Sequence, residues 1–239
     1  MPPIKTTGLV MQHTNIGEYD RMLCVLSPKL GIIQVSAKGA RSMKAGLHNA
    51  TRSFCYAEFV LYPAKKEIYT LKSASPLEVF FALAEDLDRL EAATMIAKFT
   101  RYLCLSADYA GDMLRLVLDS YYALCHDSPV QKVETTFLLK AAQISGFSPD
   151  VTSCARCGST EALSWLDCAH GTCLCSSCSS QRNLTPALLA MFQYILSSPI
   201  ERCFSYRAQE ELITAANTLL VDFVQQHIGY WGAKRKPMK

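Results

Sequence analysis

Residues 21–37 read RMLCVLSPKLGIIQVSA, and this stretch decides the fold of the first part of the chain. Two short runs, 21–27 and 32–37, are rich in apolar and β-branched residues and flank the turn-forming segment Pro28-Lys29-Leu30-Gly31. Runs of this length bounded by Pro and Gly are typical of β-strands. The stretch therefore predicts two strands joined by a short connection.

Three more runs of the same kind lie around this pair, at residues 6–12, 55–62 and 67–71. Five short strands within about 75 residues suit a small closed barrel. The longest connection, residues 38–53, falls between the third and fourth strands, where a barrel of the OB type has its longer crossing. We therefore expect an N-terminal five-stranded OB-type barrel over residues 1–77, a fold that often binds oligonucleotides.

The hydrophobic period changes after Ser75-Pro76. Apolar residues recur every three or four positions from Val79 to Leu103, which predicts a helix with Pro76 near its start. The same period, with capping residues at the ends, predicts helices at about 112–125, 130–145, 186–198 and 209–228. The expected fold is thus α+β and multidomain: the barrel, then an all-α domain over 78–239 with a cysteine-rich insert at about 150–182.

Composition excludes several classes of protein. The chain has 239 residues, of which 50% are hydrophobic and 19% charged, so it can bury a core and is not disordered throughout. It has no stretch of eighteen apolar residues and no secretory signal at its start, so we expect a cytoplasmic protein without a membrane partner. Six of its eleven cysteines fall between positions 154 and 178, and in an intracellular protein such a cluster indicates a metal site.

The cluster contains two CxxC motifs, Cys154-Ala155-Arg156-Cys157 and Cys175-Ser176-Ser177-Cys178. Zn²⁺ prefers four soft ligands in a tetrahedron, and two such turns supply four thiolates. The spacing predicts one structural Zn²⁺ held by Cys154, Cys157, Cys175 and Cys178, with no open position for catalysis.

Three neighbours leave alternatives open. Cys173 could take the place of Cys175, although it would not form the usual turn with Cys178, and Cys168 and His170 also lie nearby. Packing or a spare thiol is the favoured interpretation of both cysteines, and a loop position is the favoured interpretation of His170.

A second constellation is basic. Lys38, Arg41, Lys44 and Arg52 fall within fifteen residues, with no acid between them. Residues 1–78 carry a net charge of +5, residues 79–230 carry −6 and the last nine carry +4. The basic ends of the chain therefore indicate binding to a polyanion. Such cations bind phosphates without regard to base sequence, and Phe54 and Tyr56 could stack on bases. The alternatives are a solvated loop and core packing.

Together, the segments Thr14–Arg21 and Lys38–Arg41 and the double CxxC motif ahead of a C-terminal helix resemble the bacterial RecO family of recombination mediators, over nearly the whole chain. The resemblance implies binding of single- and double-stranded DNA without sequence preference and annealing of complementary strands. It implies that the protein, with RecR, helps to load RecA onto DNA coated by single-stranded DNA-binding protein. It also implies that the protein binds the acidic, hydrophobic C-terminal tail of that binding protein and that RecF is a further partner in some pathways.

Carried onto this sequence, the resemblance makes Lys38, Arg41 and Lys44 the first candidates for phosphate contacts. Arg21 and Arg52 come second, and Arg21 could instead pair with Glu18 or Asp20. A pocket for the tail is expected in the helical domain, edged by a cation, with Arg101, Arg115 and Lys132 as unranked candidates.

No nucleotide-binding or hydrolase motif is present in the sequence, so we expect a protein that is not an enzyme. The resemblance implies that it acts in the bacterial cytoplasm, at the nucleoid. The alternative function is a zinc-stabilised adaptor that binds only proteins. A zinc-dependent enzyme is the weakest interpretation, because four thiolates leave no position for an activated water.

Overall fold

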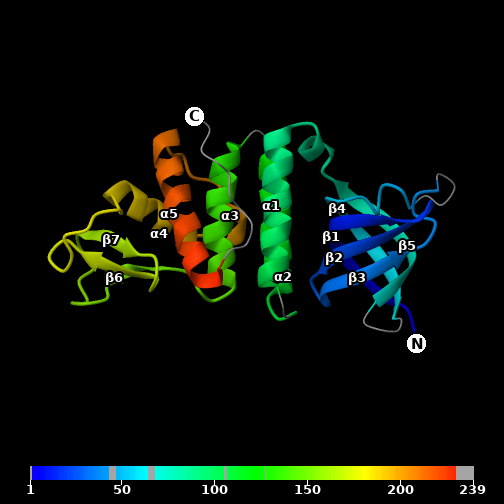
Figure 1. Ribbon diagram of the computed structural model, residues 1–239, viewed down its shortest axis with the longest axis horizontal. Helices are drawn as coiled ribbons and strands as arrows, with labels where there is room; N and C mark the ends of the chain where they lie inside the picture. Colours follow the sequence, from blue (N-terminus) through cyan, green and yellow to red (C-terminus); the bar gives the residue numbers. More distant parts are fainter. Residues whose placement is uncertain (1, 43–46, 64–67, 105–106, 127, 230–239) are drawn as a thin grey trace. The chain divides into compact units, whose positions relative to one another are not determined.

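The computed structural model in Figure 1 describes residues 2–42, 47–63, 68–104, 107–126 and 128–229. The chain divides into two compact units, residues 1–125 and residues 126–239. Among the described residues, every helix is too short or too polar to span a bilayer.

Unit 1 begins with a closed five-stranded barrel, drawn in blue and cyan in Figure 1. Its strands are β1 (Ile4–Ile16), β2 (Asp20–Ser27), β3 (Gly31–Ala37), β4 (Cys55–Pro63) and β5 (Ile68–Val79). They are ordered β1-β2-β3-β5-β4, and β1 closes the barrel by pairing with both β2 and β4. This arrangement confirms the OB-type barrel predicted from the sequence, and the long connection does lie between β3 and β4.

Alternate strand residues fill the barrel. Val25, Val35 and Phe59 are buried and belong to one apolar cluster inside it. Cys24 and Leu26, which follow the opposite face of β2, are also buried, and β2 is in contact with α2 (Ala110–Cys125). The continuous apolar run in β2, without polar alternation, is therefore the sequence signature of a strand covered on both faces.

The helix expected to begin near Pro76 starts later than the sequence pattern predicts. Residues 75–79 belong to β5, and Pro76 pairs with Ala57 where the register of β4 and β5 shifts. A strand tolerates proline at such an irregularity because no regular ladder hydrogen bond is lost there. The short 3₁₀ helix η3 (Phe81–Ala84) follows, and α1 (Leu87–Leu103) begins only after Asp86, whose Oδ1 accepts the N–H of Arg89 at 2.9 Å.

Unit 2 contains α3 (Val130–Ile144), α4 (Pro186–Ser197), the 3₁₀ helix η4 (Ile200–Arg202) and α5 (Glu210–Ile228). The predicted start of α4 is confirmed: Thr185 caps the helix through the N–H of Leu188, with Pro186 as its first residue. The buried Lys140 of α3 donates to the carbonyl oxygens of Leu196 and Ser198 at 3.1 and 2.6 Å, so it caps the other end of α4.

The cysteine-rich insert between α3 and α4 folds as a small sheet, which the sequence pattern did not predict. Its strands are β6 (Asp150–Cys154), β7 (Leu163–Asp167) and β8 (Thr172–Cys175), ordered β6-β8-β7. The sheet is held on the helices by Gln193 of α4, whose Nε2 donates to the carbonyl oxygen of Val151 at 2.8 Å. The sequence places the domain boundary at 77/78 because the helical period begins there, and that boundary stays a prediction.

The corrected start of α1 can be tested by its cap. Replacing Asp86 with Ala removes the side-chain acceptor for the N–H of Arg89 and should lower the free energy of unfolding by about 1 kcal/mol. Asp88 lies in the first turn of the same helix, where a carboxylate is stabilised by the helix dipole but does not make the cap hydrogen bond, so Asp88→Ala should cost a few tenths of a kcal/mol. Urea denaturation followed by circular dichroism measures both. Equal losses would contradict the assignment of Asp86 as the cap.

A candidate four-cysteine metal centre and a candidate nucleic-acid interface

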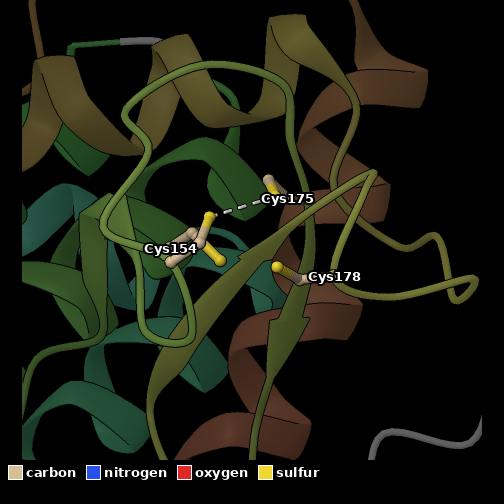
Figure 2. Close-up of side chains that lie close together, drawn as sticks. Cys154, Cys175 and Cys178 are labelled. Atoms are coloured by element: carbon tan, nitrogen blue, oxygen red, sulfur yellow. Dashed lines mark hydrogen bonds between the residues drawn. The ribbon is translucent and has the colours of Figure 1, made fainter.

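The four cysteines of the two CxxC motifs lie together. The Sγ atoms of Cys154, Cys157, Cys175 and Cys178 are all within 4.8 Å of one another. Figure 2 shows the labelled side chains of Cys154, Cys175 and Cys178 converging from the two turns, and the dashed line marks the 3.7 Å contact of Cys175 Sγ with Cys157 Sγ. Four thiols in so small a space form a set that could hold a metal ion.

Each motif is a tight turn at the end of a strand. Cys154 ends β6, and its carbonyl oxygen accepts the N–H of Gly158 at 2.8 Å. Cys175 ends β8, and its carbonyl oxygen accepts the N–H of Cys178 at 3.0 Å. Because β6 and β8 are parallel neighbours, with Cys154 opposite Cys173, the two turns meet at the same end of the sheet. Arg156 joins them further by donating from Nη1 to the carbonyl oxygen of Cys178 at 2.6 Å.

The electrostatics of the cluster fit a cation. Hydrogen bonds from the backbone N–H of Cys175, Cys157 and Arg156 lower the pKa of the Cys154 thiol to about 6. In contrast, hydrogen bonding to the other sulfur atoms, with Cys157 first, raises the pKa of Cys178 to about 12. Four neighbouring thiols cannot all lose their protons unless a positive charge compensates the four thiolates that form. A divalent cation bound by the sulfur atoms would supply that charge.

The alternative ligands lie outside this set. Cys168 and Cys173 are buried, and burial raises the pKa of each thiol to about 12, which disfavours the thiolate that a metal needs. The Cys168 thiol faces α5, with its Sγ 3.8 Å from the carbonyl oxygen of Leu219. His170 is exposed, and its Nδ1 lies 2.8 Å from Oδ2 of Asp167.

A second candidate site lies on the barrel, where the two sequence segments that carry the family resemblance meet. The backbone N–H of Gly39 donates to Oδ1 of Asp20 at 2.8 Å, with Gly39 at a φ of +66° that favours glycine. Arg41 donates from its backbone N–H to the carbonyl oxygen of Tyr19 at 2.9 Å and from Nη1 to that of Gly17 at 3.0 Å. The turn between β1 and β2 thus holds in place the start of the basic loop, as we call residues 38–52 with their four cations.

The predicted DNA-binding residues occupy different environments within this site. Lys38 and Arg41 are exposed, so their charges face solvent beside the β1–β2 turn. Arg52 is half-buried, with Cζ 5.5 Å from the centroid of the Phe81 ring. Lys44 lies outside the described residues.

Arg21 is buried, with 6% of its surface exposed, and its hydrogen-bond partners are not Glu18 or Asp20, the alternative that the sequence left open. Its Nη1 instead donates to the carbonyl oxygen of His48 at 2.9 Å and to Oγ1 of Thr51 at 2.8 Å. Burial, followed by the nearby Arg52, lowers the pKa of Arg21. We therefore assign Arg21 to holding the far end of the loop and leave it out of the proposed phosphate contacts.

The loop region has a positive field that also acts on His13. Nδ1 of His13 accepts the backbone N–H of Ser53 at 3.0 Å, which requires an unprotonated Nδ1. Burial lowers the pKa of His13, and the positive charges of Arg21 and Arg52 lower it further. The same positive field attracts a polyanion.

A cavity of about 350 Å³ lies between the barrel and α1 within unit 1. Its lining comes from β1, the residues before β4 and one face of α1: Met11, Gln12, Ser53, Phe54, Leu90, Thr94, Ala97, Lys98 and Arg101. Arg101 Nη1 donates to Oε1 of Gln12 at 2.6 Å, and Lys98 is exposed. Phe54, for which the sequence left base stacking and core packing open, packs edge-on against Tyr121 with ring centroids 5.5 Å apart.

Fold and sites define a class of protein: an OB-type barrel with an anchored basic loop, followed by a helical region with a four-cysteine centre. Family models described as "Recombination protein O N terminal" and "Recombination protein O C terminal" match residues 1–80 and 84–237. The chain belongs to the RecO family of DNA repair proteins.

Individual relatives agree with this assignment. The chain is 33% identical over 220 residues to the DNA repair protein RecO of Acetivibrio thermocellus, an alignment that covers 88% of this chain and 86% of the relative. It is 27% identical to the protein of the same name from Alkaliphilus metalliredigens, with 94% of each chain covered.

The composition of the candidate metal centre can be tested by single substitutions. Cys175→Ser removes one of the four clustered thiols and should abolish or sharply reduce the metal that copurifies with the protein. Cys173→Ser is the matched control, because this thiol lies two residues away but outside the cluster, and it should retain the metal. Inductively coupled plasma mass spectrometry measures the content. Equal loss in both variants would show that the quartet is wrong.

Proposed function

We propose that this protein is a recombination mediator that binds single- and double-stranded DNA without sequence preference through the basic loop of its barrel. In this proposal it anneals complementary strands and, with RecR, helps to load RecA onto DNA coated by single-stranded DNA-binding protein. The observation that carries the proposal is the anchored loop: Asp20 holds Gly39, the β1–β2 turn holds Arg41, and Lys38 and Arg41 stay exposed.

The proposed DNA contact is electrostatic. Lys38 and Arg41 present charge to the sugar–phosphate backbone, and the counterions that the DNA releases favour binding. Because backbone contacts position a strand without reading its bases, the contact has no sequence preference. Gly39 and Arg41 are already held by hydrogen bonds, so little conformational entropy is lost at these residues when they meet a strand.

Annealing follows from the same charge. Two strands must approach although their phosphates repel each other, and a cationic surface screens that repulsion. No covalent bond forms or breaks, so we propose that the protein acts by binding and is not an enzyme. The proposed place of action is the cytoplasm, at the nucleoid, with RecF as a further partner and RecA reached indirectly.

The four-cysteine centre is proposed to bind one structural Zn²⁺. Four thiolates match the preference of zinc and complete its coordination, so the ion would stabilise the insert without taking part in a reaction. Zn²⁺ binding to such a site contributes to folding, on the order of 10 kcal/mol at neutral pH. The insert would then present a fixed surface on α4 and α5 rather than a loose loop.

The cavity beside α1 is the proposed site for the tail of the single-stranded DNA-binding protein. Phe54 and Leu90 offer an apolar wall, and Lys98 and Arg101 bring positive charge to its edge. A peptide that is acidic and ends in apolar residues is complementary to both features. Of the other cations considered for this role, Arg115 forms an ion pair with Asp119 at 3.1 Å, and Lys132 lies 4.7 Å above the Tyr206 ring.

Charge reversal tests the DNA contact. The double substitution Lys38→Glu and Arg41→Glu should abolish binding of a labelled single-stranded oligonucleotide at physiological salt, measured by fluorescence anisotropy. With alanine at the same two positions, the slope of log affinity against log salt should fall by roughly 0.7 for each lost cation.

Lys29→Glu is the control, because it reverses one charge of the same kind in the exposed turn at the opposite end of the β2–β3 pair, and it is compared with the single variant Lys38→Glu. It should leave binding close to the wild-type level. If the wild-type protein does not bind DNA even at low salt, the adaptor that binds only proteins becomes the better explanation.

The tail site is tested with a synthetic peptide of the C-terminal tail of the host's single-stranded DNA-binding protein. Replacing Lys98 and Arg101 with Ala removes the positive edge of the cavity and should weaken peptide binding about tenfold in calorimetry. Arg115→Ala removes an exposed cation from α2 outside the cavity and should have no effect. Equal weakening by both variants would mean that the peptide responds to general charge rather than to this cavity.

A further inference from the structure

We infer that Tyr19 is a base-stacking residue that gives single-stranded DNA a contact that a duplex cannot make. The inference rests on the proposed function, because it adds a second contact to the same loop. It differs from that function in chemistry: the loop cations bind phosphates, whereas Tyr19 would bind the face of a base.

Tyr19 is an exposed aromatic residue in a hairpin turn. It lies in the short turn between β1, which ends at Ile16, and β2, which begins at Asp20, and 60% of its surface is exposed. An exposed ring on a hairpin turn is free to stack on a base, and what distinguishes Tyr19 from other exposed aromatic residues is its place beside the cationic loop.

The backbone of Tyr19 is joined to the cationic loop. Its carbonyl oxygen accepts the N–H of Arg41 at 2.9 Å, and the neighbouring Gly17 carbonyl oxygen accepts Nη1 of the same arginine at 3.0 Å. The tyrosine and the arginine therefore belong to one hydrogen-bonded structure, with Lys38 exposed close by in the chain. Cations beside an aromatic ring form the usual arrangement for holding a single strand, since the cations follow the backbone while the ring stacks on a base.

The charges of the turn favour a base over a phosphate at Tyr19. Asp20 already accepts the N–H of Gly39, but Glu18 is exposed within the same turn and would repel a phosphate. A strand that follows Lys38 and Arg41 would thus turn a base, rather than its backbone, toward Tyr19. In a duplex the bases are already stacked on one another, so the ring gains nothing there.

Other aromatic residues near the loop are less suited to this role. Phe54 packs edge-on against Tyr121, and the Phe81 ring has the Arg52 guanidinium 5.5 Å from its centroid. The neighbours of these two rings are protein groups in unit 1, whereas Tyr19 is exposed and its backbone carbonyl oxygen accepts the N–H of Arg41.

The test compares Tyr19→Ala and Tyr19→Phe with Tyr122→Ala. Tyr122 lies in α2 and has the same exposed fraction of 60%, so it is a matched control for the loss of a surface tyrosine. The probes are a labelled oligodeoxythymidine of about 20 nucleotides, a duplex of the same length and an abasic oligonucleotide with the same phosphates.

Tyr19→Ala should weaken binding of oligodeoxythymidine roughly tenfold, with an unchanged salt slope, because stacking releases no counterions. Its affinity for the duplex and for the abasic strand should equal that of the wild type. Tyr19→Phe keeps the ring and should bind like the wild type, as should Tyr122→Ala.

Two outcomes would overturn the inference while leaving the proposed function intact. Wild-type affinity of Tyr19→Ala for oligodeoxythymidine would mean that the ring meets no base and serves another contact, such as a protein partner. An equal loss on the thymidine and abasic strands would mean that the substitution disturbs the loop. If the wild-type protein fails to bind any of the probes, the proposed function and the inference fall together.

Discussion

Strand β1 is the constraint on which the arrangement of the barrel and of its candidate DNA-binding loop depends. Its first half, Ile4 to Val10, pairs with β4, and its second half, Leu9 to Ile16, pairs with β2. One strand therefore closes the barrel and then continues into the turn that anchors Arg41. A shorter β1 would leave the barrel with open edges or the loop without its support, so closure and loop position are consequences of the same pairing.

Much of this fold could be predicted because local patterns and tertiary structure agree. Strands β2 to β4 and the helices after residue 110 follow hydrophobic period and capping residues closely. The exceptions have physical causes. Pro76 resembles a helix start because proline favours a first turn, yet a register shift gives it a place in β5. The small sheet of the insert has no clear pattern in the sequence because its strands are short and depend on the cysteine turns that close them.

The two sites differ in how many of their residues could be predicted from the sequence. A CxxC motif fixes two thiols within one turn, so two motifs were enough to predict which four of the clustered cysteines lie together. The role of Arg21 depends instead on where residues 48–51 lie in space, and no local pattern reports that. Tyr19 could not be singled out for the same reason: only the hydrogen bonds to Arg41 show that this turn and the basic loop are one structure.

The contacts of the two sites also indicate how their contributions combine. The loop is held by barrel residues, namely Gly17, Tyr19, Asp20 and Arg21, whereas the insert is held by α4 and α5 through Gln193 and the backbone of Leu219. Effects of substitutions add when the sites have no partners in common. A metal bound by the four cysteines would therefore act on the stability of unit 2, whereas the proposed charge and aromatic contacts of the loop belong to unit 1. A substitution that changes the affinity of one site should therefore leave the structure and the affinity of the other site unchanged.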